Sequence, residues 1–413
     1  MTPAALHEWL ADPRQPQRDK LDALYAHVAA IRAYSDDDYR AAIREIKRRL
    51  KSPKLAGELN TLLGALARVM IPVAHVEPEE PAVAFEGTDP DDPRGCELEA
   101  RIAADPEDRG RYLVYGDHLT DRGDPLGEFI AIGLALEKNP TQKAMRTAHD
   151  AWLAQHGARY WGGLAGFQRA LRTPVLYLGF VKSCALIARF EFRATPLAEL
   201  VAALFAGPGR FLQELVIEPG EGLTAIAATL GARPRPTLRK LKLGASREHL
   251  GDLSAMWPGL VGLRELELER MAVGLGAIAA PRLEKLAINY GPGEDGTHTI
   301  APLQRVLRAE QLPALRSLAI TNCECADELC GALAASRVLP QLTELDLSMG
   351  TMTAAGAAIL VRERERFAHL AIKLELNYLS ETAGAELAAS LEKLELGEQR
   401  SDDGGYRHAA DYE

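Results

Sequence analysis

Three cysteines within eight residues, Cys323, Cys325 and Cys330, form the only cysteine cluster in the chain. A structural zinc site usually takes four soft ligands, arranged as two pairs of closely spaced residues. This cluster has spacings of one and four intervening residues, with no histidine nearby in the sequence. The pattern favours buried cysteines, which behave as small hydrophobic side chains, and we predict no metal site.

A second group surrounds His118 with the aspartates Asp117, Asp121 and Asp124. Carboxylates can bind a divalent cation, and a histidine can act as a general base. The spacing of a calcium-binding helix–loop–helix motif is absent, however. Helix caps and turns account better for aspartates in such a segment, and we favour that interpretation.

Other motifs that carry chemistry are missing from the sequence. The glycine-rich segment 291–296 lacks the Lys-Ser/Thr ending of a phosphate-binding loop. No Gly-x-Ser-x-Gly, His-Glu-x-x-His or Cys-x-x-Cys occurs. We therefore predict no catalytic residues, no cofactor, and a protein that is not an enzyme.

Composition and charge narrow the class of protein. The chain has 413 residues, 47% of them hydrophobic and 26% charged, as expected for a globular protein of two or three domains. Its net charge of -10 disfavours nucleic acid as a partner. No run of about 18 apolar residues is present, so no membrane partner is expected. The start of the chain lacks signal-peptide features and the five cysteines do not suggest a disulfide framework, which favours a cytoplasmic location.

A repeated hydrophobic pattern supplies the elements that would position functional side chains. From about residue 175 the motif L-x-x-L-x-L recurs nine times, with starts 20 to 32 residues apart. Its members are Ile187/Phe190/Phe192, Leu212/Leu215/Ile217, Leu238/Leu241/Leu243, Leu263/Leu266/Leu268, Leu283/Leu286/Ile288, Leu315/Leu318/Ile320, Leu342/Leu345/Leu347, Ala371/Leu374/Leu376 and Leu391/Leu394/Leu396. Each match predicts a short strand with one buried face, followed by an Ala/Leu-rich helical segment. Stacked units would form a curved parallel sheet backed by helices.

These residues resemble leucine-rich-repeat proteins, chiefly the helix-backed class typified by ribonuclease inhibitor and the Ran GTPase-activating protein. The resemblance covers about residues 187–399 and implies an α/β solenoid. Cys323 lies eight residues after Leu315, where these repeats commonly have Asn or Cys. The resemblance specifies the fold and says little about function.

A second resemblance precedes the repeats. The segments 98–106 (LEARIAADP), 113–119 (LVYGDHL) and 122–130 (RGDPLGEFI) are similar to the bacterial repeat-companion domain, a helical module that often precedes leucine-rich repeats in bacterial proteins. Gly116 stands where that family usually has Ala, and His118 where it usually has Trp. This resemblance implies a bacterial protein of this architecture and brings no activity with it.

The expected organisation has five parts. They are a helical domain (1–75), an acidic Pro-rich linker (76–95), a helical repeat-companion module with its connection (96–174), a leucine-rich-repeat solenoid (175–399) and a polar tail (400–413).

The third, fifth and seventh positions of each motif should point outward, onto the concave face of the sheet. The predicted partner-binding residues there are Glu191, Glu214, Glu218, Lys240, Lys242, Glu265, Glu267, Glu269, Lys285, Asn289, Glu344, Asp346, Lys373, Glu375 and Asn377. A rigid charged face is a ready binding surface, although it can also be merely solvated. We predict a protein–protein interaction scaffold whose partner is another protein. The alternative, by fold analogy, is a regulator or inhibitor of a partner enzyme, such as a GTPase or a nuclease.

Overall fold

The computed structural model describes most of the chain beyond residue 91. The described residues are 92–165, 170–187, 197–218, 223–244, 253–269, 275, 278–291 and 298–401. The chain divides into two compact units, residues 1–80 and 81–413, and every described residue lies in the second. The predicted helical domain (1–75), most of the linker and most of the tail therefore lie outside the described residues.

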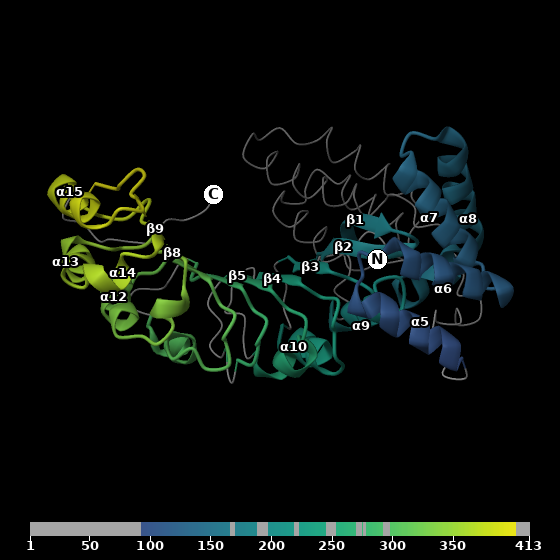
Figure 1. The fold of residues 1–413 in the computed structure, drawn as a ribbon, viewed down its shortest axis with the longest axis horizontal. Coiled ribbons are helices and arrows are strands. Elements are labelled where there is room, and N and C mark those ends of the chain that lie inside the picture. Colours follow the sequence, from purple (N-terminus) through teal and green to yellow (C-terminus); the bar gives the residue numbers. More distant parts are fainter. Residues whose placement is uncertain are drawn as a thin grey trace, which may run out of the picture. The chain divides into compact units, whose positions relative to one another are not determined.

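The described part of the second unit starts with four helices (Figure 1). They are α5 (Pro93–Ala104), α6 (Arg109–Asp121), α7 (Leu126–Lys138) and α8 (Lys143–Trp161), followed by the 3-10 turn η2 (Gly162–Leu164). Asp92 caps α5 because its Oδ1 accepts a hydrogen bond from Gly95 N at 2.9 Å, and Pro93 suits the first helical position. Helix α5 thus starts inside the segment predicted as linker, whose boundary at residue 95 was wrong for this reason.

The core of these helices is rich in aromatic side chains. Phe129 stacks on Trp152 with ring centroids 4.0 Å apart, and Tyr112 packs edge-on against Phe211 at 5.8 Å. Phe180 and Phe211, which belong to the start of the sheet region, are buried in this same cluster. The helices therefore cover the first end of the sheet with a shared hydrophobic core.

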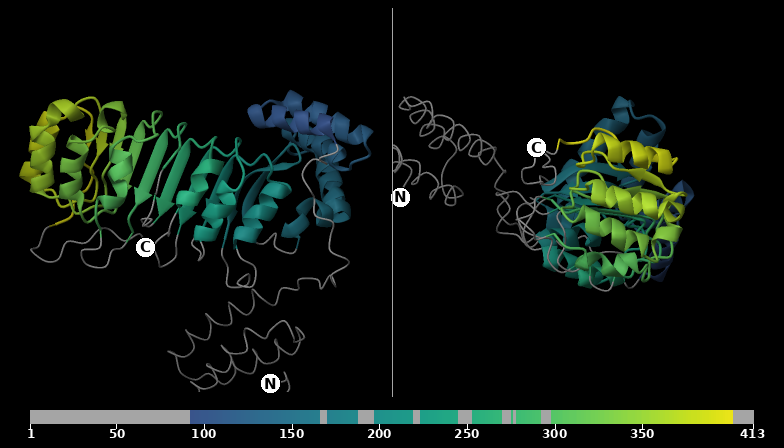
Figure 2. Two further views of the ribbon diagram at one scale, coloured as in Figure 1. Left: turned by 90° about the horizontal axis from the view of Figure 1, so that it is seen from below. Right: turned by 90° about the vertical axis from the view of Figure 1, so that its left-hand side faces the viewer.

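In the part of the chain that the structure describes, ten strands form one sheet and follow one another in sequence order (Figure 2). They are β1 (Leu171–Tyr177), β2 (Phe180–Leu186), β3 (Glu214–Ile217), β4 (Lys240–Gly244), β5 (Glu265–Glu269), β6 (Lys285–Asn289), β7 (Ser317–Thr321), β8 (Glu344–Asp346), β9 (Ala371–Lys373) and β10 (Leu394–Glu395). Strands β1 and β2 pair antiparallel, and all other neighbours pair parallel. The described residues thus form a mostly parallel, open α/β sheet with a solenoid-like order.

Helical segments connect the parallel strands. They are α9 (Leu197–Ala206), α10 (Leu223–Gly231), η5 (Ser254–Gly259), η6 (Ala301–Leu303), α11 (Gln304–Leu307), α12 (Ala326–Ala334), η7 (Leu339–Gln341), α13 (Ala354–Arg362), α14 (Arg364–Phe367) and α15 (Glu381–Ser390). Their apolar residues share one continuous core with the inward leucines of the strands, for example Leu241, Leu266 and Leu318. One face of the sheet is therefore buried, and alternation turns the remaining strand side chains outward.

The pairing of the strands corrects two predicted repeat positions. Strand β2 pairs directly with β3, so the first parallel strand is Phe180–Leu186 and not the Ile187/Phe190/Phe192 match. Near the other end, Ile372 pairs with Leu345, which places that unit two residues earlier than the predicted start at residue 371. Both errors arise because neighbouring apolar residues offered a second match to the same motif. The sheet itself begins at Leu171, four residues before the predicted boundary.

Candidate functional site on the exposed face of the sheet

Parallel pairing brings the outward side chains of successive strands into rows across the sheet. One row runs through Glu214, Lys240, Glu265, Lys285 and Ser317, each paired with the next in register. A neighbouring row includes the pair Lys242 and Glu267. Acidic and basic residues thus alternate from β3 to β6, and cross-strand neighbours of opposite charge attract one another.

The centre of this face is an ionic network on β4, β5 and β6. Lys242 Nζ lies 2.7 Å from a carboxylate oxygen of Glu267 and 2.5 Å from one of Glu269. Glu265 lies between Lys240 at 3.5 Å and Lys285 at 3.9 Å. The three glutamates and three lysines balance in charge, so the run of glutamates on β5 is neutralised by its neighbours.

Lys242 is the most enclosed cation of this network. Partial burial alone would lower its pKa, but hydrogen bonds to Glu267 and Glu269 outweigh that effect and the pKa is raised. The ammonium group therefore stays charged over the whole neutral range and holds the two carboxylates beside each other.

Replacing Lys242 with glutamine should lower the free energy of unfolding by up to about 1 kcal/mol, since all three groups are partly exposed and such pairs are weak. The two glutamates left without their shared cation then repel each other. Urea unfolding followed by circular dichroism measures the change, and about 1 M salt should shrink it by screening. Lys240→Gln, which removes one longer contact, is the control and should have a smaller effect. A loss that salt leaves unchanged would contradict the electrostatic origin.

The far end of the face, on β8 and shortly after β9, carries acidic side chains that differ from the central glutamates in their salt bridges. Glu344, Asp346 and Glu375 form no salt bridge with any described residue, whereas Lys373 lies 3.5 Å from Glu395. Asp346 Oδ1 accepts a hydrogen bond from Ser348 N at 2.9 Å, which fixes its orientation. Among the described residues, no cationic group therefore lies within salt-bridge distance of these three carboxylates.

Most of the predicted binding residues lie on this face. Glu214, Glu218, Lys240, Lys242, Glu265, Glu267, Glu269, Lys285, Asn289, Glu344, Asp346, Lys373 and Glu375 occupy outward positions of the strands or directly follow them. Asn289 is half-buried and its Oδ1 accepts a hydrogen bond from Gly291 N at 2.8 Å. Glu191 lies outside the described residues.

Asn377 was wrongly assigned to the exposed face. Its side chain is fully buried, because the corrected start of the unit places it where the chain turns inward after β9. Its Nδ2 donates to Leu347 O at 2.9 Å and to Leu374 O at 3.1 Å, and its Oδ1 accepts from Met352 N at 3.0 Å. Asn377 therefore binds the backbone of two successive units, and its role is structural.

Of the three aspartates near His118 in the sequence, Asp124 has a local structural role. Asp124 Oδ1 accepts a hydrogen bond from Leu126 N at 2.9 Å at the start of α7, while Asp117 and Asp121 are exposed. His118 Nε2 lies 2.7 Å from Asp92 Oδ2, the same carboxyl that caps α5, and this hydrogen bond keeps the pKa of Asp92 below its ordinary value. Among the described residues no group of three or more His, Cys, Asp or Glu side chains is placed to hold a metal ion.

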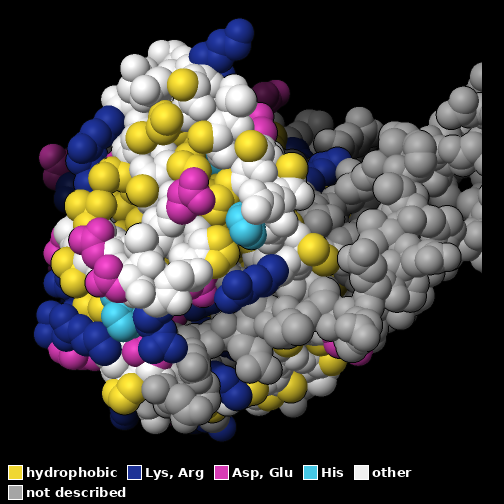
Figure 3. Space-filling model, turned by 90° about the vertical axis from the view of Figure 1, so that its right-hand side faces the viewer, with side chains coloured by type: hydrophobic (Ala, Val, Ile, Leu, Met, Phe, Trp, Pro, Cys, Tyr) yellow, Lys and Arg dark blue, Asp and Glu magenta, His cyan; other side chains and the backbone are white. Residues whose placement is uncertain are grey.

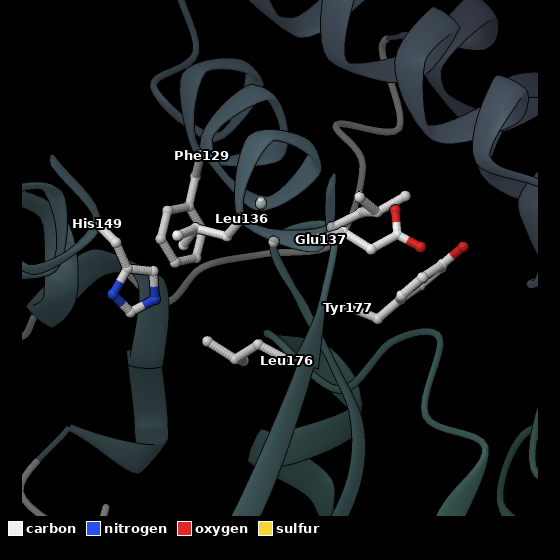
Figure 4. Close-up of a pocket in the computed structure, with 9 residues that line it drawn as sticks. Phe129, Leu136, Glu137, His149, Leu176 and Tyr177 are labelled. Carbon is white, nitrogen blue, oxygen red and sulfur yellow. The ribbon is translucent and has the colours of Figure 1, made fainter. Parts of the chain in front are cut away.

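A small cavity of about 210 Å³ lies between α7, α8 and the β1–β2 hairpin (Figure 4). Phe129, Leu136 and Leu176 line it, with His149 on one side. Glu137 and Tyr177 direct their polar ends away from His149 (Figure 4). Arg109 binds the Glu137 carboxylate at 2.9 Å, and the Tyr177 hydroxyl donates to Glu107 O at 3.2 Å. The cavity is smaller than a usual ligand pocket, and its polar rim already serves the protein's own contacts.

On the face of the helical end seen in Figure 3, no one kind of described side chain predominates. Figure 3 shows hydrophobic, acidic and basic side chains interleaved there. Leu113 and Val114 are the largely exposed apolar residues that α6 contributes. The face of the sheet is therefore the stronger candidate for recognition.

None of the described helices is long and apolar enough to cross a membrane.

The fold and this face define a repeat-like α/β protein with an open, mostly parallel sheet. No family model matches the chain, and no curated protein matches it. The solved structures similar to it include the crystal structure of a protein from Bacteroides fragilis, determined by a structural genomics consortium. The two share 21% sequence identity with a TM-score of 0.40, over 54% of this chain and 76% of that chain.

Proposed function

We propose that residues from about 171 to 399 form a leucine-rich-repeat solenoid of the helix-backed class, whose exposed sheet face binds another protein. The strands follow in sequence order with leucines turned inward, which supports the repeat assignment. Cys323 and Asn377 are both buried just after a strand, at the position where such repeats place Asn or Cys.

The helices before the sheet belong, in this proposal, to a repeat-companion module. The segment RGDPLGEFI supports the assignment because several of its residues form the turn and the hydrogen bonds that position α7. Gly123 turns the chain with a φ of +74°, Asp124 Oδ1 accepts a hydrogen bond from Leu126 N in the turn before α7, and Pro125 O accepts the indole hydrogen bond of Trp152 at 3.0 Å. The bacterial origin and the cytoplasmic location are part of the same proposal.

The observation that carries the binding function is the set of three carboxylates, on β8 and shortly after β9, that form no salt bridge with any described residue. On the described face acids outnumber bases nine to five. The acids are Glu214, Glu218, Glu265, Glu267, Glu269, Glu344, Asp346, Glu375 and Glu395, and the bases are Lys240, Lys242, Lys285, Lys373 and Lys393. A rigid array with excess acid favours a partner with a basic surface, because complementary charge steers association and sets register.

Affinity capture with the full chain tests this function. The double variant Glu344→Lys/Asp346→Lys should reduce recovery of the main partner, measured by quantitative mass spectrometry, by at least about tenfold, equivalent to about 1.4 kcal/mol of binding free energy. The matched control is Glu365→Lys/Glu386→Lys, which makes the same change in charge at exposed positions of α14 and α15. Equal recovery with both variants, while each melts like the wild type, would refute binding at this face.

A further inference from the structure

The turn after β7 brings two sulfur atoms together outside the proposed binding face. Cys323 Sγ and Cys325 Sγ are 3.2 Å apart and share a hydrogen bond. Cys323 is only 1% exposed, whereas Cys325 is partly accessible to solvent. The pair therefore combines one accessible thiol with one protected thiol at its side.

The backbone of this turn is held in place by the next unit of the sheet. Thr351 N donates to Cys323 O at 3.1 Å, and the Thr351 hydroxyl donates to Glu324 O at 2.7 Å. Asn322 enters the turn with a φ of +58°, a conformation that asparagine tolerates better than most residues. A disulfide has a bond length of about 2.05 Å, so the two sulfur atoms would have to approach each other by a little over 1 Å. Rotation of the two side chains can supply this approach.

The shared hydrogen bond also divides the chemical roles. Either sulfur of the neutral pair can be the donor. When Cys325 ionises, the Cys323 thiol donates to its thiolate, and this hydrogen bond lowers the pKa of Cys325 despite burial and the nearby Glu328 carboxylate. The same hydrogen bond, together with burial, raises the pKa of Cys323. Cys325 is thus the better nucleophile and also the more accessible one.

We propose that Cys323 and Cys325 form a redox-active pair that a hydroperoxide oxidises to a disulfide. The Cys325 thiolate attacks the peroxide oxygen, the O–O bond breaks, and Cys325 sulfenic acid and an alkoxide or hydroxide ion form. The Cys323 sulfur then attacks the Cys325 sulfur, the S–OH bond breaks, and water leaves with the proton from Cys323. The protein loses two electrons and two protons in total, and a dithiol reductant reverses the reaction.

The third cysteine of the cluster is not the expected partner. Cys330 is fully buried on α12, and burial raises the pKa of its thiol to about 12. It therefore lacks both the accessibility and the thiolate character that reaction with a peroxide requires. The exposed Cys96 is distant in sequence and is best replaced by serine in all test proteins.

The test treats the full-length Cys96→Ser protein with hydrogen peroxide, then alkylates the remaining thiols in denaturant. We expect two of the four thiols to resist alkylation until dithiothreitol is added. Cleavage after Glu310, Glu324 and Glu328 puts Cys323, Cys325 and Cys330 on different peptides, so a peptide pair held together identifies the bond. Mass spectrometry should find the peptides of Cys323 and Cys325 joined, with the mass of two hydrogens lost.

Two single variants distinguish the thiol that attacks the peroxide from the thiol that then forms the disulfide, and a third variant is the control. Cys323→Ser should leave Cys325 as a sulfenic acid that dimedone captures, whereas Cys325→Ser should leave Cys323 unreacted. Cys330→Ser should form the same disulfide as the parent. Four free thiols after peroxide treatment, or a disulfide that includes Cys330, would overturn the proposal.

Discussion

Replacing Asn377 with alanine should destabilise the protein by about 3 to 5 kcal/mol. The substitution removes the hydrogen bonds to Leu347 O, Leu374 O and Met352 N. Each buried backbone group left without a partner costs about 1 to 3 kcal/mol, although Leu374 O keeps a hydrogen bond from Gln399. Urea unfolding, followed by far-ultraviolet circular dichroism, should show the loss as a lower midpoint.

Asn289→Ala is the matched control for this prediction. Asn289 is half-buried and its Oδ1 accepts a hydrogen bond from Gly291 N two residues later, so loss of the side chain should cost no more than about 1 kcal/mol. Similar midpoints for the two variants would mean that Asn377 does not connect successive units energetically. Such a result would also weaken the assignment of these units as leucine-rich repeats.

Replacing Gly231 with alanine should destabilise the protein by about 3 kcal/mol, the upper part of the range for overpacking. An added Cβ at the end of α10 would collide with the backbone carbonyl of Ala255 and come within 3.1 Å of Met256 Cα. These are backbone atoms of η5, and relief requires the two helical segments to move apart. The melting temperature and the urea midpoint should both fall.

Gly331→Ala provides the opposite control. Gly331 lies within α12, and an added Cβ there would meet only Ile359 Cδ1, at 3.9 Å. Alanine is favoured over glycine inside a helix by up to about 1 kcal/mol, so this variant should be unchanged or more stable. If both glycine variants were equally destabilised, close approach of α10 and η5 would not be the cause.

Much of the sheet was predictable from local sequence. The alternation in Leu238/Leu241/Leu243 and its counterparts specifies a strand with one buried face, and seven of the strands fall where such matches occur. The role of Asp124 in a turn was also predictable, because an aspartate side chain readily accepts a hydrogen bond from the backbone N–H two residues later. In both cases the physical cause acts over a few neighbouring residues.

The register of the strands was harder to predict, and it decided whether a single site residue is exposed or buried. Two overlapping matches near residue 371 differ by two positions, and both satisfy the alternation of a strand. When the motif is shifted by two residues, Lys373 and Glu375 stay on the same face, but Asn377 falls beyond the strand and into the core. Only pairing with β8, which aligns Ile372 with Leu345, distinguishes the two.

By itself the sequence determined that α/β units recur, that most leucines of the motif are buried and that most charged residues between them are turned outward, because these follow from periodicity along the chain. The tertiary structure decided which charges neutralise one another across β4, β5 and β6, and which carboxylates on β8 and β9 lack a salt bridge among the described residues. It also decided that Cys323 and Cys325 share a hydrogen bond and that Asn377 connects two units. Such contacts depend on distances between atoms of separate strands or on the path of a turn, and no periodic pattern in one segment contains them.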